Sequence, residues 1–212
     1  MSDLEPDWLL WAREVQATAQ TGLAFTKDPY DRERYEALRA LAGRMLAART
    51  DGSAEGYATL FASEAGYATP KIDVRGAVFD AAGRILMVRE VMDSNRWTLP
   101  GGWADVSQTP AQSAVREVFE ETGFHARAVK LAAVWDHATQ GHWPPGFYSI
   151  VKHFFLCELT GGAAQTSLET SEVAFFAEDE IPADLSLGRI LPRQISRMFA
   201  HWHDRSLPTE WD

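Results

Sequence analysis

The sequence has only one cysteine and no long apolar run. With Cys157 alone, the 212-residue chain cannot form an intrachain disulfide. Because Cys157 ends the apolar run 154–157, a buried structural thiol is favoured over a nucleophile. No apolar run of about 18 residues and no signal peptide is recognisable, so we expect no membrane association. The cytoplasm is the expected compartment.

Basic residues are scarce relative to acidic ones. The chain has 20 lysines and arginines against 30 aspartates and glutamates, which gives a net charge of −10. This balance argues against a protein that binds nucleic acid through charge, so no nucleic-acid partner is expected. A nucleotide substrate remains compatible with it, because a bound metal ion can supply local positive charge. The hydrophobic content of 46% is sufficient for one large or two small domains.

Residues 1–66 carry helical patterns and no strand pattern. Asp28-Pro29 and Ser53 are typical helix starts, and they predict a second and a third helix after a first one. Three short helices bury little apolar surface, so we expect this helical domain to pack on the remaining chain or on a second subunit. The first helix would place a largely aromatic stripe in that core or interface: Trp8, Trp11, Val15 and Leu23.

Residues 67–212 change to strand patterns. Alternating apolar residues predict a strand at 72–78, and a turn at 80–83 leads to a return strand at 85–88. Strands around a central helix indicate an α/β sandwich with a mixed sheet, preceded by the small all-α domain. The remaining predicted elements are strands at about 127–136, 148–159 and 172–177 and a helix at about 189–203.

An acidic helix is predicted in the middle of this second region. Its carboxylates, on Glu117, Glu120 and Glu121, fall within an arc of about 100° of the helix surface. At an effective dielectric constant of 20, their repulsion would reach about 3 kcal/mol per pair. A hard divalent cation with oxygen ligands would relieve that repulsion.

The residues around this helix predict a strand, a glycine loop and a helix in succession. Thr109 and Gln112 can form a capping box, and Gly123 suits a left-handed C-terminal cap. Gly101-Gly102 follows an apolar strand end and leaves backbone groups accessible. Paired glutamates on a helix are usually solvated, so the functional interpretation depends on the complete string.

The complete string resembles the Nudix box, which asks for Gly, five residues, Glu, seven residues, then Arg-Glu-apolar-any-Glu-Glu-any-Gly-apolar. One position departs, because Gln108 stands where the first Glu is expected. In the family that Glu mainly holds the arginine, so the resemblance implies a weakened scaffold and not an inactive site. The matching residues are Gly102, Arg116, Glu117, Val118, Glu120, Glu121, Gly123 and Phe124.

The resemblance extends to a Nudix subgroup with an N-terminal helical domain. Its members hydrolyse nucleoside diphosphates linked to another moiety, X, and include ADP-ribose and CDP-choline pyrophosphatases. The resemblance implies an α/β/α sandwich, a Mg²⁺ or Mn²⁺ cofactor, and a homodimer. The segments that carry it are Trp8–Ala12, Ala19–Leu23, Tyr30-Asp31, Arg34-Tyr35, Gly66–Arg75, Leu99–Val106 and Phe175-Phe176.

The resemblance also implies roles for individual residues. Glu117, Glu120 and Glu121 would hold the metal together with the carbonyl of Gly101, and Arg116 would orient a carboxylate by a bidentate contact. A general base often comes from a loop outside the box. Glu172 is the first candidate for that base and Glu169 the second, and for each a solvated surface acid is an equal alternative.

Substrate contacts are predicted in the loop 137–145 and on the first strands. His137 and His142 could bind phosphate and Trp143 could stack on a base, although each is more often a surface residue. Arg75 and Arg89 could meet phosphate or pair with acidic residues instead.

Two other functions compete with a hydrolase of X-linked nucleoside diphosphates. A Nudix-fold sensor would bind a nucleotide without cleaving it, and Gln108 is the feature that favours it. An RNA-directed phosphohydrolase is disfavoured by the net charge of −10.

Overall fold

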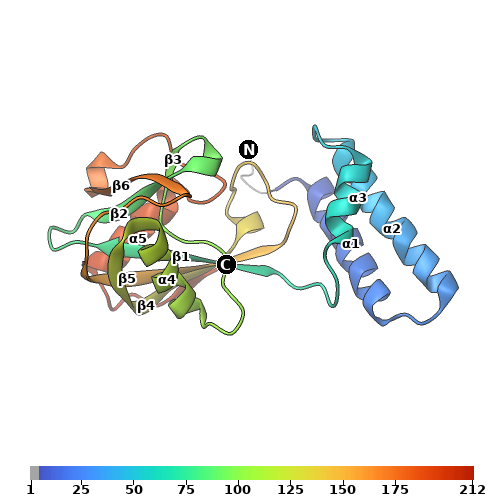
Figure 1. The fold of residues 1–212 in the computed structure, drawn as a ribbon, viewed down its shortest axis with the longest axis horizontal. Coiled ribbons are helices and arrows are strands. Elements are labelled where there is room, and N and C mark those ends of the chain that lie inside the picture. The colour runs from blue at the N-terminus through green and yellow to red at the C-terminus, as the bar shows by residue number, and fades with distance from the viewer. Residues whose placement is uncertain (1–4) are drawn as a thin grey trace. The chain divides into compact units, whose positions relative to one another are not determined.

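The computed structural model describes residues 5–212, and these divide into two units (Figure 1). The first comprises residues 5–70 together with 147–149, and the second comprises residues 71–146 and 150–212. Residues 1–4 of the expected helical domain lie outside the described residues.

The first unit contains the expected helices, α1 (Asp7–Phe25), α2 (Pro29–Ala47) and α3 (Ala54–Ala62). The Asp28 side chain caps α2 by accepting from the backbone N–H groups of Tyr30 and Asp31, and Ser53 caps α3 by accepting from Gly56. Both predicted helix starts are therefore confirmed.

The predicted stripe on α1 is only partly correct. Trp8 and Val15 lie at the margin of the core, but Trp11 is 57% exposed. The buried face carries residues smaller than tryptophan, and α1 and α2 approach closely at Gly22, where a Cβ would come within 2.4 Å of the Tyr35 ring. The residues of α1 that are buried are Leu9, Ala12, Gln16 and Ala19.

The second unit is built on a mixed sheet, as predicted. Its central pair, β1 and β5, is parallel, and Asp73 lies opposite Lys152 in the register. The strand order is β3-β2-β1-β5-β4-β7, and β6 pairs with β2. The strands are β1 (Lys71–Phe79), β2 (Ile85–Glu90), β3 (Arg96–Thr98), β4 (Phe124–Asp136), β5 (Ile150–Gly162), β6 (Thr170–Phe176) and β7 (Glu210–Trp211).

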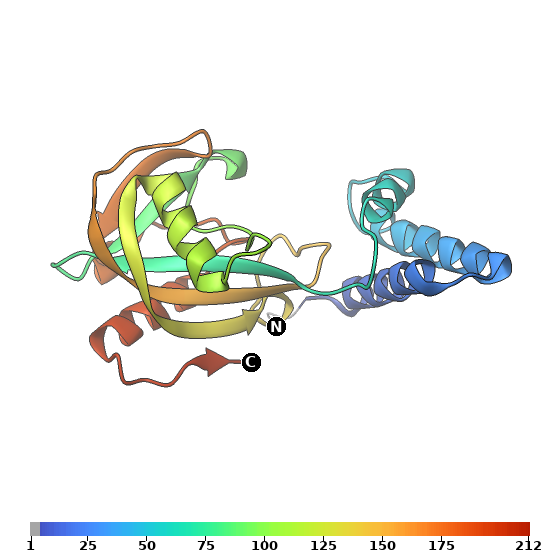
Figure 2. The same ribbon diagram turned by 60° about the horizontal axis from the view of Figure 1, so that its bottom comes forward.

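Two helices cover the sheet from opposite faces (Figure 2). Helix α4 (Pro110–Thr122) packs through Ala114 and Val118 on one face of β1 and β5, and α5 (Pro192–His203) packs on the other. Short 3-10 turns lie at Val91–Asp93, His137–Thr139 and Glu178–Glu180. The predicted α/β/α sandwich is confirmed, although α5 begins three residues later than expected and β7 was not predicted.

The single cysteine lies inside this sandwich. Cys157 is fully buried in the cluster beneath α4, and burial raises the pKa of its thiol to about 12. The predicted structural thiol is confirmed. Among residues 5–212, no helix is both long and apolar enough to cross a membrane.

Candidate active site

Helix α4 is fixed at both ends by the residues that the sequence singled out. Thr109 accepts from the backbone N–H of Gln112, and the Gln112 side chain accepts from the N–H of Thr109 at 2.9 Å. Gly123 ends the helix with φ +72°, where a Cβ would lie 2.5 Å from the Ala163 carbonyl oxygen. The capping box and the left-handed C-cap are confirmed, and they set the rotation of the acidic face.

The three glutamates of α4 differ in exposure. Glu121 is 4% exposed, and its carboxylate accepts from the N–H of Gly101 at 3.0 Å. Glu117 is half-buried beside Gly102, and Glu120 is more exposed. Glycine is required at 101, because φ is +148° and a Cβ would fall 2.0 Å from the Val74 carbonyl oxygen. The glycine loop therefore presses directly against the acidic helix.

Arg116 ties the other two glutamates together. Its Nη2 donates to Glu117 Oε1 at 2.8 Å, and its Nη1 donates to Glu120 Oε2 at 2.5 Å. Its Nε donates to Gln108 Oε1 at 3.3 Å, an oxygen that also accepts from Ser113 Oγ at 3.2 Å. Arg116 therefore bridges Glu117 and Glu120 with one contact to each, whereas the family resemblance implied a bidentate contact to one carboxylate.

We predict that Gln108→Glu keeps or raises kcat/KM, by up to about fivefold. Both donors at Gln108 point to its acceptor oxygen, so a carboxylate would fit there and would strengthen the bond to Arg116 by charge assistance. Steady-state kinetics should compare it with Gln108→Ala, which removes the acceptor and is expected to lower the rate. A large loss of kcat in Gln108→Glu would contradict this role.

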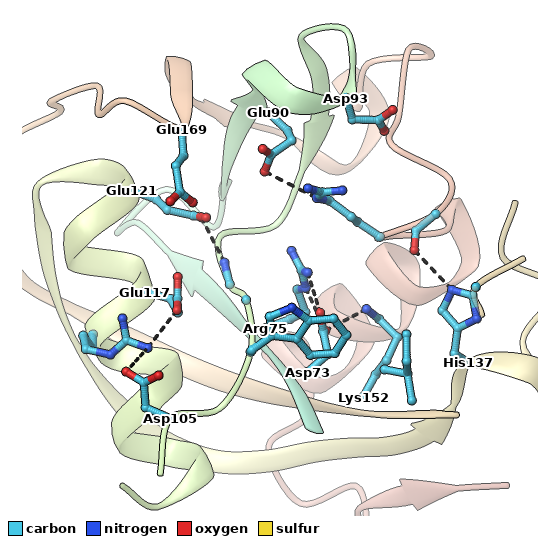
Figure 3. A pocket seen from close by; sticks show the side chains of 18 of the residues that line it. Asp73, Arg75, Glu90, Asp93, Asp105, Glu117, Glu121, His137, Lys152 and Glu169 are labelled. Atoms are coloured by element: carbon cyan, nitrogen blue, oxygen red, sulfur yellow. Dashed lines mark hydrogen bonds and ion pairs between the residues drawn. The ribbon is translucent and has the colours of Figure 1, made fainter. Parts of the chain in front are cut away.

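The acidic helix borders a cavity of about 600 Å³ (Figure 3). A depression of about 350 Å³ adjoins it and shares Arg116, Glu117, Glu121 and Glu169 with it. Glu120 also lines the depression. The depression is therefore lined by all three carboxylates of α4, by Glu169 and by one arginine, Arg116. The cavity itself has both acidic and basic walls. Its acidic residues include Glu90, Asp93, Asp105, Glu117, Glu121 and Glu169, and its basic residues are Arg75, Arg116, Lys152 and Arg189.

Two carboxyl groups of α4, those of Glu117 and Glu121, have raised pKa values. Burial raises the pKa of Glu121 to about 8, with a further contribution from Glu117, and burial also raises the pKa of Glu117. In the described part of the chain, no three His, Cys, Asp or Glu side chains converge closely enough to hold a metal ion as they stand. The donor set nevertheless fits a hard cation: four carboxylates face one arginine, and a cation would allow Glu121 to ionise.

The structure separates the predicted site residues into two groups. Gly101, Glu117, Glu121, Arg116, Arg75 and His137 line the cavity, and Glu120 lines the adjoining depression. Of the two candidate bases, Glu169 lines both spaces, whereas Glu172 lines neither. The Glu172 carboxylate instead pairs with Arg89 at 3.0 Å.

Arg89 is a salt-bridge residue, the second of the two alternatives considered for it. Besides Glu172, it pairs with Asp184 at 3.1 Å and donates to the Asn95 carbonyl at 2.7 Å. Its guanidinium also lies over the ring of Trp97, 4.8 Å from the centroid. These contacts occupy the group away from the cavity.

The two loop histidines have different surroundings. His142 is 2% exposed, its Nδ1 lies 2.9 Å from the Leu187 carbonyl oxygen and its Nε2 lies 3.2 Å from the Gln194 amide. Burial lowers the pKa of His142 to about 3, so it cannot offer positive charge to a phosphate. It stacks on His137, which does line the cavity. Trp143 is 67% exposed, and neither it nor His142 lines the cavity.

Asp73, Lys152 and Trp103 are among the cavity residues that the sequence did not predict as site residues. Asp73 and Lys152 are both buried on the central strands, and Trp103 is half-exposed on the cavity wall. The available signal was a charged residue inside an otherwise apolar strand pattern, as in Ile72-Asp-Val-Arg75 and Ile150-Val-Lys152.

Comparison with known proteins accounts for both units. Residues 6–61 match the family model described as "UDP-X-like, N-terminal oligomerisation domain". Residues 69–196 match the model of the NUDIX domain.

Similar proteins cover between about two thirds and nearly all of the chain. A protein of Bacillus subtilis (strain 168), named "Putative ADP-ribose pyrophosphatase YjhB", is 43% identical over 94% of each chain. The crystal structure of a UDP-X diphosphatase is 35% identical and matches with a TM-score of 0.60 over 97% of this chain and 98% of its own. An ADP-ribose pyrophosphatase of Streptococcus suis 89-1591 is 34% identical, with a TM-score of 0.60 over 68% of this chain and all of its own.

Proposed function

Because this chain belongs to the NUDIX hydrolase family, we propose that it cleaves nucleoside diphosphates linked to another moiety, X. The products would be a nucleoside monophosphate and phosphorylated X. The observation that carries this proposal is that one cavity has a carboxylate wall (Glu117, Glu121 and Glu169) and a cationic wall (Arg75 and Lys152). A diphosphate could span the space between these two walls.

The carboxylate wall would hold Mg²⁺ or Mn²⁺. Glu117, Glu120 and Glu121 are the proposed ligands, with the carbonyl of Gly101. A bound divalent cation neutralises diphosphate oxygens and lowers the pKa of water. Arg116 keeps Glu117 and Glu120 in position through its paired contacts.

Proton transfer is assigned to Glu169. A water oxygen attacks one phosphorus, the bridging P–O bond breaks, and the leaving phosphate takes the electron pair. Glu169 would accept the water proton, because it lines both spaces that Glu121 lines. Glu172 remains the second candidate, in the reverse of the order predicted from sequence.

The test is a substrate panel of ADP-ribose, CDP-choline, UDP-glucose, NADH, nucleoside triphosphates and capped RNA, each with and without Mg²⁺ or Mn²⁺. We expect metal-dependent release of a nucleoside monophosphate from at least one of the first three. The names of the relatives favour ADP-ribose or a UDP-linked compound. Nucleotide binding without turnover would replace the hydrolase by a sensor, and turnover confined to capped RNA would make it an RNA-directed enzyme.

We further propose that the enzyme is a cytoplasmic homodimer assembled through the helical unit. That unit matches a model described as an oligomerisation domain, and it leaves Trp11, Phe25 and Tyr30 exposed. Sedimentation velocity should give twice the chain mass of 23.6 kDa. A species of one chain mass at micromolar concentration would reject the dimer.

A further inference from the structure

Three charged side chains form a buried cluster at the cationic wall of the cavity. Asp73 and Arg75 lie two residues apart on one face of β1, and Lys152 lies opposite Asp73 on β5. Their exposed fractions are 6%, 3% and 2%. Charged residues are almost never this buried unless they are paired, so the pairing within the cluster is informative.

The cluster contains one more cation than anion. Asp73 Oδ1 accepts from Lys152 Nζ at 2.7 Å and from Arg75 Nε at 2.9 Å, and Asp73 Oδ2 accepts from Arg75 Nη2 at 2.6 Å. One carboxylate therefore serves two cations, which leaves a charge of +1. The remaining donor group of Arg75, Nη1, binds the Leu99 carbonyl at 3.1 Å.

Lys152 is the less satisfied of the two cations. An ammonium has three donors, and within residues 5–212 the structure gives it one acceptor, Asp73. The pKa of Lys152 is lowered to about 8, mainly by burial and also by the positive charges of Arg75 and Arg189, although the Asp73 carboxylate raises it. An anion beside Lys152 would remove this penalty.

The position of the cluster indicates what kind of anion would bind beside Lys152. Lys152, Arg75 and Asp73 line the same cavity as Glu117 and Glu121. Figure 3 shows Glu121 and Glu169 at one side of the cavity and Lys152 with His137 at the other. A ligand with two adjacent anionic groups could meet a metal at the first side and the cluster at the second.

We propose that Lys152, held on Asp73 beside Arg75, binds the non-bridging oxygens of the substrate phosphoryl group that lies away from the carboxylates of α4. This inference rests on the proposed function and adds to it a residue that recognises the diphosphate itself. Asp73 is a positioning residue, because it holds both cations at a fixed spacing. The enzyme should therefore require two adjacent phosphoryl groups and bind monophosphate esters poorly.

The test replaces the ammonium by an apolar group of similar length, in Lys152→Met. Asp73 keeps both of its contacts to Arg75, so the variant should fold. Calorimetric titration with inorganic pyrophosphate, in the presence of Mg²⁺, should show affinity lower by about 10- to 100-fold, with a similar rise in KM. Lys27→Met is the matched control, because Lys27 is exposed in the helical unit and its loss changes net charge equally.

The outcomes are distinct. Unchanged pyrophosphate affinity and KM in folded Lys152→Met overturn the inference. If that variant does not fold, Lys152→Gln removes the charge while keeping a donor for Asp73, and the same two readouts decide. Pyrophosphate binding that depends on Lys152 in a protein that hydrolyses nothing in the panel would reject the proposed function and leave the inference standing.

Discussion

Replacing Glu121 by glutamine is expected to lower kcat by about a thousandfold while leaving the fold intact. The Glu121 carboxylate is buried at the centre of the carboxylate wall, and a glutamine oxygen can still accept from the Gly101 N–H. The amide has no charge, however, and is a weaker ligand for a hard cation. Stabilisation by a metal ion is worth several kcal/mol, and each 1.36 kcal/mol changes the rate tenfold, so the loss should be about three powers of ten.

The Mg²⁺ dependence separates this cause from a general defect. Turnover of Glu121→Gln should be measured as Mg²⁺ is titrated. The matched control is Glu33→Gln, which makes the same chemical change at an exposed glutamate of α2. The control should retain wild-type turnover. Full activity of Glu121→Gln at ordinary Mg²⁺ concentrations would remove Glu121 from the proposed ligands.

The same variant tests the raised pKa of Glu121. In the absence of metal, burial raises that pKa from its ordinary 4.5 to about 8, so the folded protein holds a proton that the unfolded chain releases. This contribution to stability is present below about pH 4.5 and is lost as the pH rises through about 8. The melting temperature in EDTA should therefore fall across this window, and it should fall less in Glu121→Gln. If the melting temperature depended on pH identically in both proteins, the pKa of Glu121 would not be raised in the metal-free protein.

The acidic helix could be predicted because its signals lie close together in the sequence. Thr109, Gln112 and Gly123 determine where the helix starts and stops, and that rotation determines which side the glutamates share. These interactions are local, and each was found where it was expected. The family resemblance then supplied the chemistry that charge spacing alone left open.

The pairing of Asp73 with Lys152 could not be predicted, because it depends on strand register. Asp73 and Lys152 are 79 residues apart in the chain, and only the parallel pairing of β1 and β5 brings them together. The stripe on α1 was only partly correct for a related reason. Periodicity indicated a face of the helix, but the residues that are buried depend on how α2 packs against it, as at Gly22, where the two helices approach closely.

The order of the two candidate bases also depends on register. Both lie within four residues, so sequence spacing could not distinguish them. In the structure Glu172 lies opposite Arg89 within the β2–β6 pair, whereas Glu169 precedes the first residue of β6. Its carbonyl accepts from the Val91 N–H at 2.9 Å, and the next residue, Thr170, donates its hydroxyl to the Glu121 carbonyl at 2.7 Å. The chain at Glu169 and Thr170 is therefore hydrogen-bonded both to the segment that follows β2 and to α4.

This difference predicts opposite results for two isosteric substitutions. Glu169→Gln should lower kcat by about 10²- to 10⁴-fold with little change in KM, because it removes a proton acceptor without removing volume. Glu172→Gln should stay within about twofold of wild type, because it weakens only a half-exposed ion pair with Arg89. Each variant is the control for the other, since they are three residues apart and lose the same charge. Turnover at saturating Mg²⁺ decides: an active Glu169→Gln beside an inactive Glu172→Gln would mean that the loop rearranges when substrate binds, and that the base is Glu172.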